Sequence, residues 1–404
     1  MAGRSITCAD CGSTQTVPEL LGPGTVECYR CSRVLDRRPA APLDATFALA
    51  AAMFVLLPPA VFMPLMDSTI QNLLYEESRL VSSVPVIYSE VWFPFAFGFL
   101  FFAFLFPAFR ALFLMVVLAS IRWGFPVWQR GRLFRWSEEL RIWSMTDVVV
   151  IAGAVAYFRA SVPADVEVRV GAWCYLAVAA LALIIDRTLA RREIWNAILP
   201  DRPRIAREHV VSCDVCELTV TSRRPGDHCP RCGSRLDRAI AVRFIPAVAA
   251  VAAAIPLYLP AYTFSVMVND QLTAVLEHTV VGTIQLLADH GYWQFSIIIL
   301  FAGIAIPIIE LLGLMWLLAR VRFPERHGLV LRTRLYRILH RLVRWPMIIP
   351  FIAAIAAPIV DFRGVDDIIA GPGATPLFML IALIMLAIRL FEPQHMWKTA
   401  GVQG

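Results

Sequence analysis

The sequence predicts an all-α polytopic membrane protein built as a tandem duplication of one module. Three observations support this fold class. Of the 404 residues, 58% are apolar and only 17% are charged, whereas soluble domains carry about 25% charged residues. The mean hydropathy is +0.65. Eight of the nine cysteines form two quartets, and each quartet precedes a series of long apolar segments.

The duplication is visible as landmarks that recur in the same order at a spacing of 200 to 205 residues. They are the first cysteine of each quartet, a proline inside an apolar segment and two tryptophans: Cys8 with Cys213, Pro107 with Pro307, Trp143 with Trp345, and Trp195 with Trp397. We therefore divide the chain into four parts. Residues 1–40 and 201–240 each hold a cysteine quartet, and residues 41–200 and 241–404 each hold a membrane module.

The apolar segments predict about four transmembrane helices in each module, since a helix needs about 17–25 mostly apolar residues to cross a bilayer. In the first module they are Ala45–Met66, Trp92–Ser120, Trp143–Ala160 and Gly171–Leu189. In the second module they are Ile245–Val266, Tyr292–Leu318, Trp345–Val360 and Thr375–Phe391. The count of eight includes several short segments that contain proline.

The distribution of arginine predicts the orientation. Thirty of the 37 Lys and Arg residues lie in four segments, which are 1–44, 121–142, 187–244 and 319–344. The alternating segments 67–91, 161–170, 267–291 and 361–374 hold three. Loops rich in Lys and Arg stay in the cytoplasm. We therefore expect both quartets and both chain termini to be cytoplasmic.

The two cysteine quartets have the spacing of structural zinc sites. They are Cys8, Cys11, Cys28 and Cys31, and Cys213, Cys216, Cys229 and Cys232. The patterns CxxC-x16-CxxC and CxxC-x12-CxxC fit tetrahedral thiolate coordination, in which each CxxC turn supplies two sulfurs. We expect two zinc ribbons, each with one Zn²⁺. A rubredoxin-type iron centre and a redox-active dithiol remain as alternatives.

The role of the metal is expected to be structural. Neither quartet region has enough apolar residues for a core, so the metal would supply the folding free energy. Four cysteines leave no open position for a catalytic water. Gly233 can provide the positive φ that such a turn demands. His228 is expected to be solvated, and Cys174, inside a membrane segment, to act as a small apolar residue.

Charged residues inside the first module are candidates for function, because a charge at membrane depth costs about 2.5 kcal/mol or more. Arg110 lies three residues after Pro107 in an apolar stretch. The proline removes a backbone hydrogen bond and kinks the helix there. Asp147 begins the next segment, and Asp186 lies late in the fourth. We expect Arg110 and Asp147 to form a buried pair, unless Asp147 is only a helix N-terminal residue at the interface.

The second module differs at the same positions. Glu310 follows Pro307, and Ile349 replaces the aspartate. Because the sequence shows no obvious basic residue near it within the membrane segments, Glu310 is expected to stay protonated at neutral pH. This is the property that a proton relay uses. Such a residue must face the interior of the bundle. Outside the spans, segments 67–91 and 267–291 each predict an amphipathic helix that lies on the membrane or docks a partner.

Taken together, these motifs resemble the paraquat-inducible protein A family. The matching residues are both cysteine quartets and four short motifs, namely Trp143-Ser144-Met145-Thr146-Asp147, Pro107 with Arg110, Phe391-Glu392-Pro393 with Trp397, and Thr283-Ile284. The family has a Lys where Arg110 lies. The resemblance covers nearly the whole chain, although Pro346 replaces the motif serine in the second module.

The resemblance implies a multi-pass protein of the inner membrane of a two-membrane bacterium. It implies a periplasmic MCE-domain partner, hexameric in the family, whose tunnel carries lipid across the envelope. The family member loads lipid into that tunnel or receives it, using the proton gradient. The sequence itself has no GxxxxGK[ST] nucleotide-binding motif.

A lipid-transport subunit is therefore the leading functional hypothesis, with Arg110, Asp147 and Glu310 as candidates for transport or proton relay. A second hypothesis is a non-transporting scaffold that anchors the tunnel and docks a cytoplasmic partner through the ribbons. The arginines that would support such docking are Arg223, Arg224, Arg231, Arg235 and Arg238. A membrane redox enzyme that uses the cysteines is a third. We expect no catalytic residue, membrane lipids as ligands and no nucleic-acid partner.

Overall fold

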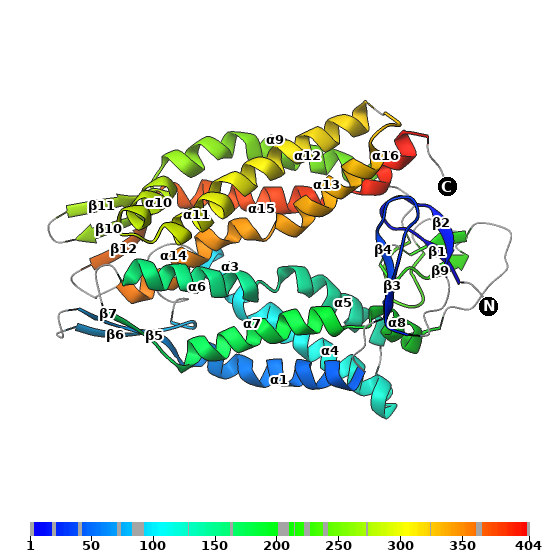
Figure 1. Ribbon diagram of the computed structural model, residues 1–404, viewed down its shortest axis with the longest axis horizontal. Helices are drawn as coiled ribbons and strands as arrows, with labels where there is room; N and C mark the ends of the chain where they lie inside the picture. The colour runs from blue at the N-terminus through cyan, green and yellow to red at the C-terminus, as the bar shows by residue number, and fades with distance from the viewer. Residues whose placement is uncertain are drawn as a thin grey trace.

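The computed structural model is an elongated helical bundle with small β-sheets at both ends (Figure 1). It describes residues 4–17, 22–38, 43–70, 74–82, 93–127, 129–161, 165–200, 210–213, 215–221, 227–236, 241–271, 274–323, 325–360 and 366–401. Both cysteine-containing regions lie at one end, called here the ribbon end. The opposite end, called the sheet end, carries two three-stranded sheets.

Module 1 consists of the helices between the two cysteine quartets. Its elements are α1 (Leu43–Phe62), α3 (Phe93–Leu100), the π-helix η1 (Phe101–Leu105), α4 (Phe106–Trp123), α5 (Arg130–Trp143), α6 (Thr146–Ala160), α7 (Val170–Thr188) and α8 (Arg191–Ile198). The three elements α3, η1 and α4 follow one another without a break, as one long helix with a π-helical segment in it.

Module 2 repeats this order after the second quartet. Its elements are α9 (Ala241–Thr263), α10 (Val280–Asp289), α11 (Trp293–Ile299), the π-helix η2 (Leu300–Ala305), α12 (Ile306–Arg322), α13 (Leu329–Leu342), the 3-10 helix η3 (Trp345–Met347), α14 (Ile348–Val360), α15 (Ala374–Leu390) and α16 (Pro393–Thr399). The predicted tandem duplication is therefore confirmed.

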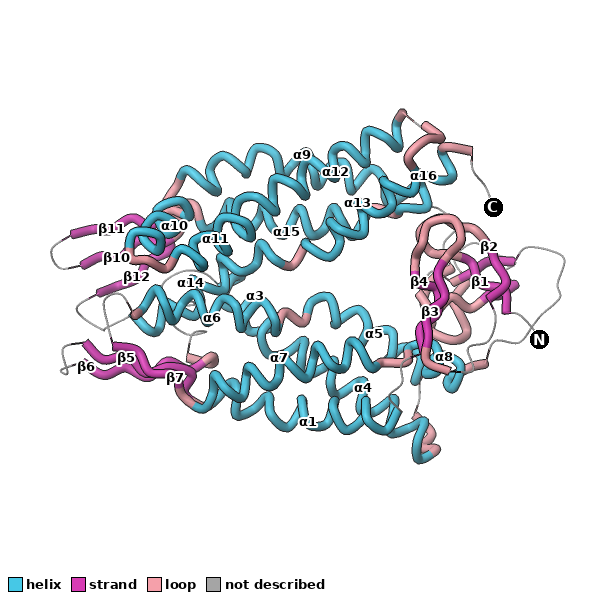
Figure 2. Tube along the Cα trace, viewed as in Figure 1, coloured by secondary structure: helices cyan, strands magenta, loops and turns pink. Residues whose placement is uncertain are grey.

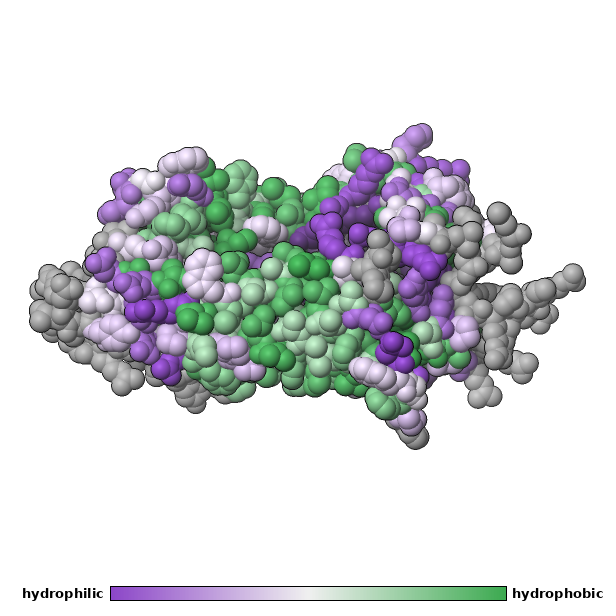
Figure 3. Space-filling model, turned by 60° about the horizontal axis from the view of Figure 1, so that its bottom comes forward, coloured by the Kyte–Doolittle hydropathy of each residue, from purple (hydrophilic) through white to green (hydrophobic). Residues whose placement is uncertain are grey.

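Six helices of the described chain are long and apolar enough to cross a membrane, and the bent pair α15–α16 makes up to seven. Eight had been predicted. The remaining segment, Trp345–Val360, forms η3 and the 13-residue helix α14. At 1.5 Å per residue α14 is about 20 Å long, shorter than the hydrocarbon core of a bilayer. Figure 3 shows an apolar band around the middle of the molecule, with hydrophilic residues toward both ends.

The sheet end carries one antiparallel sheet per module (Figure 2). In module 1 the order is β6-β5-β7, with β5 (Pro64–Ile70), β6 (Leu74–Arg79) and β7 (Asp165–Val168). In module 2 it is β11-β10-β12, with β10 (Met267–Gln271), β11 (Ala274–His278) and β12 (Asp366–Ala370). The predicted amphipathic helix over 67–91 is thus wrong where β5 and β6 lie, and residues 71–73 and 83–91 of that segment lie outside the described residues. In module 2 the hairpin precedes α10, so a helix occupies part of that segment.

One buried carboxylate organises the sheet of module 1. Asp67 on β5 is 4% exposed and forms an ion pair with Arg169 at the start of α7. The hydroxyl of Tyr75 on β6 also donates to Asp67, at 2.9 Å. Hydrogen bonding to Asp67 raises the pKa of both Tyr75 and Arg169. The β5–β6 hairpin and the start of α7, which lies about 100 residues later in the chain, are therefore held around a single acid.

The two modules meet along α6 and α14, which lie side by side in the centre of Figure 1. Small residues of α6, including Ala152 and Gly153, allow the close approach, and a Cβ added at Gly153 would lie 3.9 Å from Ile355. Phenylalanine rings extend the interface, with Phe99 of module 1 against Phe351 of module 2 at 5.5 Å. Two arginines of module 2 also reach module 1 along this interface, as described below.

Candidate metal centres and buried charges

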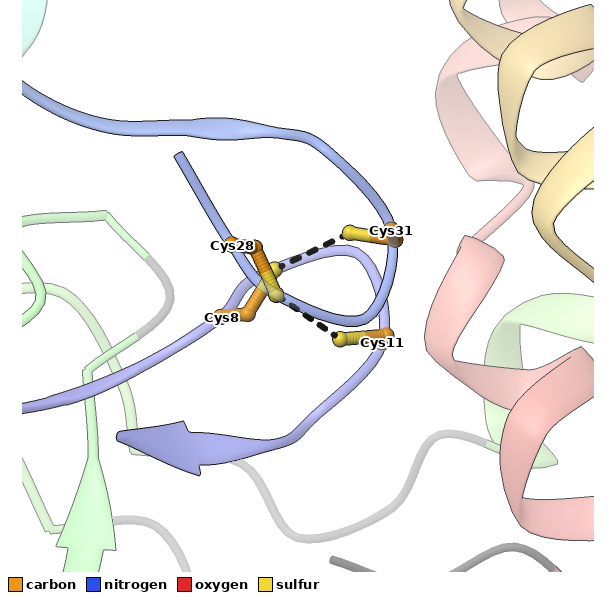
Figure 4. A group of neighbouring side chains, drawn as sticks. All are labelled: Cys8, Cys11, Cys28 and Cys31. Carbon is orange, nitrogen blue, oxygen red and sulfur yellow. Dashed lines mark hydrogen bonds between the residues drawn. The ribbon is translucent and has the colours of Figure 1, made fainter. Parts of the chain in front are cut away.

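The first cysteine quartet forms a compact four-sulfur cluster (Figure 4). It is carried by two hairpins, β1 (Arg4–Thr7) with β2 (Thr14–Val17) and β3 (Gly24–Glu27) with β4 (Val34–Arg38). This region is called ribbon 1. The Sγ atoms of Cys8 and Cys31 lie 3.5 Å apart, and those of Cys11 and Cys28 lie 3.6 Å apart. Each cysteine pair therefore joins the two hairpins.

The second quartet repeats this geometry in ribbon 2, residues 210–236, which contains the hairpin β8 (Val210–Ser212) with β9 (Thr219–Thr221). The Sγ atoms of Cys213 and Cys232 lie 3.6 Å apart, and those of Cys216 and Cys229 lie 3.5 Å apart. In each quartet all four sulfurs lie within 4.8 Å of one another, and all eight residues are buried.

Both clusters fit a tetrahedral metal ion. A zinc–sulfur distance of about 2.3 Å places tetrahedral sulfurs about 3.8 Å apart, close to the shortest separations found here. The cysteines of both groups would hold the ion, with no protein position left open. Zinc in such a site supplies folding free energy to the surrounding turns.

The four metal-binding turns share one backbone feature. The residue after the second cysteine of each CxxC has a positive φ, namely Gly12 at 72°, Ser32 at 55°, Glu217 at 57° and Gly233 at 68°. The amide of this residue donates to the carbonyl of the first cysteine, as in Gly12 to Cys8 at 2.8 Å. The positive φ expected at Gly233 is confirmed, and in two turns a residue other than glycine adopts it.

Ribbon 1 docks on module 2. Arg337 of α13 donates to Asp10 at 2.7 Å, to the carbonyl of Cys31 at 2.8 Å and to its Sγ at 3.3 Å. The guanidinium of Arg30 lies 5.5 Å from the ring centroid of Trp397 on α16. Burial opposes the charge of Arg33, but Asp10 and Glu217 outweigh it and raise the pKa of its guanidinium.

Ribbon 2 docks on module 1. Arg231 donates to the carbonyl of Leu199, after α8, and its own carbonyl oxygen lies against Gly131 of α5, where an added Cβ would be only 1.7 Å away. Arg231 is 5% exposed, so it is not part of a free basic surface. Of the other predicted arginines, Arg235 is exposed, while Arg223, Arg224 and Arg238 lie outside the described residues.

The two ribbons also meet each other through α8. Arg192 lies 3.8 Å from Asp36 of ribbon 1 and 3.6 Å from Glu217 of ribbon 2. Arg38 of ribbon 1 pairs with Glu193 at 3.0 Å. Ribbon 1 therefore contacts both modules and links their ribbon ends.

Arg110 of α4 forms an ion pair with Asp186 of α7. Arg110 is 3% exposed. The expected partner, Asp147, instead lies 3.3 Å from Arg344 of module 2. The reason is packing, because α6 lies against α14 of module 2 and its first turn reaches Arg344. The predicted buried pair exists with a different acid.

A second contact between the modules lies one turn from Asp147. The guanidinium of Arg389, in the last turn of α15, stacks 4.1 Å from the ring centroid of Trp143. In both contacts module 2 supplies the cation and module 1 supplies its partner. Sequence reasoning found Trp143 and Asp147 but missed Arg344 and Arg389, because nothing in a single sequence indicates which helices of two modules meet.

Glu310 of α12 is fully buried, as its predicted role requires. Neither of its carboxylate oxygens has a hydrogen-bond partner among the described residues. The position that corresponds to Asp186 in module 2 is Ile388, also buried. The pair of module 1 is thus replaced by a single acid. A buried polar group without a partner needs an explanation beyond packing.

The two long helices that carry Arg110 and Glu310 are both interrupted one turn earlier. Pro107 lacks the N–H that in a regular α-helix would donate to the carbonyl of Ala103, in η1. That carbonyl accepts the hydroxyl of Tyr175 at 2.8 Å. In module 2, Tyr262 donates to the carbonyl of Gly303, four residues before Pro307. Both functional candidates therefore lie beside a π-helix braced by tyrosine.

Comparison with known proteins identifies one matching family model and several similar transport proteins. The family model of paraquat-inducible protein A matches residues 43–198 and 246–401, which are the two modules. The chain is 26% identical to intermembrane transport protein PqiA of Escherichia coli, covering 98% of this chain and 96% of that protein. It is 24% identical to a probable intermembrane transport protein of Haemophilus influenzae, with the same coverage.

A more partial match is lipophilic envelope-spanning tunnel protein A of Escherichia coli. It is 24% identical over 261 residues, covering 64% of this chain and 61% of that protein. No solved structure matches the chain. The relatives are named for transport and not for an enzymatic activity.

Proposed function

Because the chain belongs to the paraquat-inducible protein A family, we propose that it is an inner-membrane subunit for lipid transport. It exchanges phospholipid with a periplasmic MCE-domain tunnel protein, for movement between the inner and outer membranes. The observation that carries this proposal is Glu310, a fully buried acid that has no hydrogen-bond partner among the described residues and follows the π-helical segment of its membrane helix. Ionisable groups at this depth in transporters carry ions, protons or substrate.

The orientation follows from the charges at the ribbon end. The helices α5, α8 and α13 lie there and contain many arginines, and basic segments stay in the cytoplasm. Both zinc ribbons and both termini are therefore cytoplasmic, and the two small sheets are periplasmic. The sheet end is the surface available to the MCE-domain partner.

The energy source is the proton gradient. Glu310 carries the proton in module 2, while Arg110 with Asp186 and Asp147 with Arg344 form the charge network of module 1 and of the interface. The zinc ions are structural, because each is enclosed by four cysteines. The relatives' names support transport between membranes. The phospholipid substrate, the coupling to protons and the MCE-domain partner are proposed here.

The scaffold alternative needs free ribbon surfaces for a cytoplasmic partner. In the described chain, Arg30 and Arg231, which occupy the same position in the two quartets, are both used inside the molecule. This favours ribbons that hold the two modules over ribbons that recruit a partner.

The test is a strain that lacks this gene and redundant lipid-transport systems, complemented with variants and scored for detergent resistance. Glu310→Gln keeps the shape of the side chain and removes its proton exchange. Under the transport proposal it behaves like the deletion, although membrane levels of the protein stay normal. Glu139→Gln, at an exposed glutamate, is the matched control and complements fully. Full complementation by Glu310→Gln supports the scaffold and contradicts the proposal.

In the same strain, variants of the module 1 ion pair distinguish a role in transport from a role in folding. Asp186→Ala leaves Arg110, which is 3% exposed, without its anion, and breaking a buried pair in this way costs about 3–5 kcal/mol. The double variant Arg110→Ala with Asp186→Ala removes both charges and should recover most of the lost stability. If the pair serves transport, the double variant is stable but inactive. Restored activity would assign the pair to structure alone.

A further inference from the structure

A cavity of about 580 Å³ lies at the ribbon end, between the two ribbons and the end of module 1. Its walls come from both ribbons, from Glu138 of α5, from Asp186 of α7 and from Arg191 and Arg192 of α8. Liquid water occupies about 30 Å³ per molecule, so the cavity has room for on the order of 20 waters. Its polar walls supply partners for such waters.

Ion pairs between lining residues connect the walls of the cavity. Arg191 pairs with Glu138 at 2.7 Å, and Arg192 lies between acids of the two ribbons. Because Arg191 and Arg192 already have carboxylate partners, neither is free to bind an anionic ligand. Charged side chains of both signs line the cavity, which gives it the composition of a hydrated vestibule.

The vestibule ends at the buried ion pair of module 1. Asp186 lines it, and the same carboxylate holds Arg110. The exposed fractions of the two side chains differ, at 27% for Asp186 and 3% for Arg110. Arg110 lies 13 residues from either end of its span, Phe97–Trp123, whereas Asp186 lies two residues before the ribbon-side end of α7, Val170–Thr188. Asp186 therefore connects the open end of the protein to a buried charge on a membrane-spanning helix.

We infer that this vestibule is the cytoplasmic entrance through which water, and with it protons, reaches the Arg110–Asp186 pair. The inference takes the orientation of the protein in the membrane from the proposed function. It adds which end of the charge network is accessible to water. Ribbon 1 and ribbon 2 form part of the entrance, so the metal-binding domains shape the route as well as holding the modules. In module 2 the position of Asp186 is taken by Ile388, so the entrance belongs to module 1.

The experiment measures the accessibility of single cysteines to a membrane-impermeant thiol reagent, with the full zinc-loaded chain in native membranes. The background is Cys174→Ser, and labelling is read by mass spectrometry of the intact protein. Asp186→Cys places a thiol at the inner end of the vestibule. Leu189→Cys places one in its wall and leaves the ion pair intact. Leu183→Cys, on the outward face of the same helix, is the matched control that faces lipid.

In inverted vesicles, we expect Asp186→Cys and Leu189→Cys to react at least about tenfold faster than Leu183→Cys, because a thiol in lipid stays protonated and unreactive. In spheroplasts all three should stay unlabelled. Equal, slow labelling of the three in inverted vesicles overturns the entrance and leaves the transport proposal standing. Labelling only in spheroplasts overturns the cytoplasmic orientation, and with it the entrance as stated. Complementation by the Cys174→Ser background reports on transport separately.

Discussion

At the scale of single residues, the metal-binding turns depend on a backbone conformation that most side chains avoid. All four turns place a residue at positive φ directly after a cysteine, and glycine fills two of these positions. A side chain in this region costs about 1–2 kcal/mol. The cost at Ser32 and Glu217 is small against the folding free energy that a bound Zn²⁺ would supply to these turns.

This predicts that Gly12→Ala weakens zinc binding by ribbon 1. An added Cβ meets no atom within 4 Å, so the effect is purely conformational. The cost of about 1–2 kcal/mol corresponds to roughly tenfold faster zinc loss. The measurement is the rate of zinc transfer from the purified protein to a chromogenic chelator.

The matched control is Gly22→Ala, because Gly22 also has open space around it but is not among the residues at positive φ. It should leave the rate unchanged. Ser32→Gly should slow zinc loss, since it removes the strain at φ 55°. Equal rates for the wild type and Gly12→Ala would show that the turn is not limiting for metal retention.

At the scale of elements, the two π-helices owe their form to proline and to a hydroxyl from a neighbouring helix. The tyrosine comes from α7 in module 1 and from α9 in module 2. The duplicated modules therefore satisfy the same carbonyl position from helices that do not correspond to each other. The carbonyl four residues before the proline thus accepts a tyrosine hydroxyl in both modules, from α7 in one and from α9 in the other.

We predict that Tyr175→Phe and Tyr262→Phe each destabilise the protein by about 1–2 kcal/mol, since a buried carbonyl loses its donor. Tyr258→Phe is the matched control on α9, because its hydroxyl has no partner in the described chain; it should be neutral. Thermal unfolding in detergent, followed by tryptophan fluorescence, gives the order of stability. A loss for Tyr258→Phe as large as for Tyr262→Phe would assign the effect to general packing.

The same elements show what the sequence could predict and what it could not. The length of the apolar segments predicted the helices, and the spacing of the cysteines predicted the four-sulfur clusters, because both signals are local in the sequence. The small sheets escaped prediction, since β7 joins β5 from about 100 residues away. The partner of Arg110 escaped for a related reason. The sequence predicted Asp147 as the partner, but α6 packs against module 2, where Asp147 meets Arg344, and Arg110 pairs with Asp186 instead.

At the scale of the whole molecule, each ribbon docks on the module that does not follow it in the sequence. The ribbon that precedes module 1 binds α13 and α16 of module 2, and the ribbon that precedes module 2 binds α5 and α8 of module 1. Helix α8 contacts both ribbons, through Arg192. Each metal ion should therefore stabilise helices of the module that does not follow its cysteines in the sequence.

The last prediction follows from this arrangement. In the double variant Cys8→Ser with Cys11→Ser, ribbon 1 loses its metal, so Arg337 loses the turn to which it donates. Amide hydrogen exchange in α13 and α16 should then speed up by roughly tenfold or more, because local opening is no longer opposed by the docked ribbon. Exchange in α5 should stay unchanged. Mass spectrometry of peptides from the protein in detergent resolves these helices.

The matched variant is Cys213→Ser with Cys216→Ser, which removes the metal from ribbon 2 and should give the reverse pattern. Here α5 exchanges faster, since Gly131 no longer packs against Arg231, while α13 and α16 keep their protection. The helix α1, which packs against α7, is the internal control in both variants. If each pair of substitutions instead loosened the module that follows it in sequence, the ribbons would act on their own modules. If all helices changed together, the ribbon end would be one cooperative unit, and the link between ribbon 1 and module 2 would not be separable from the rest.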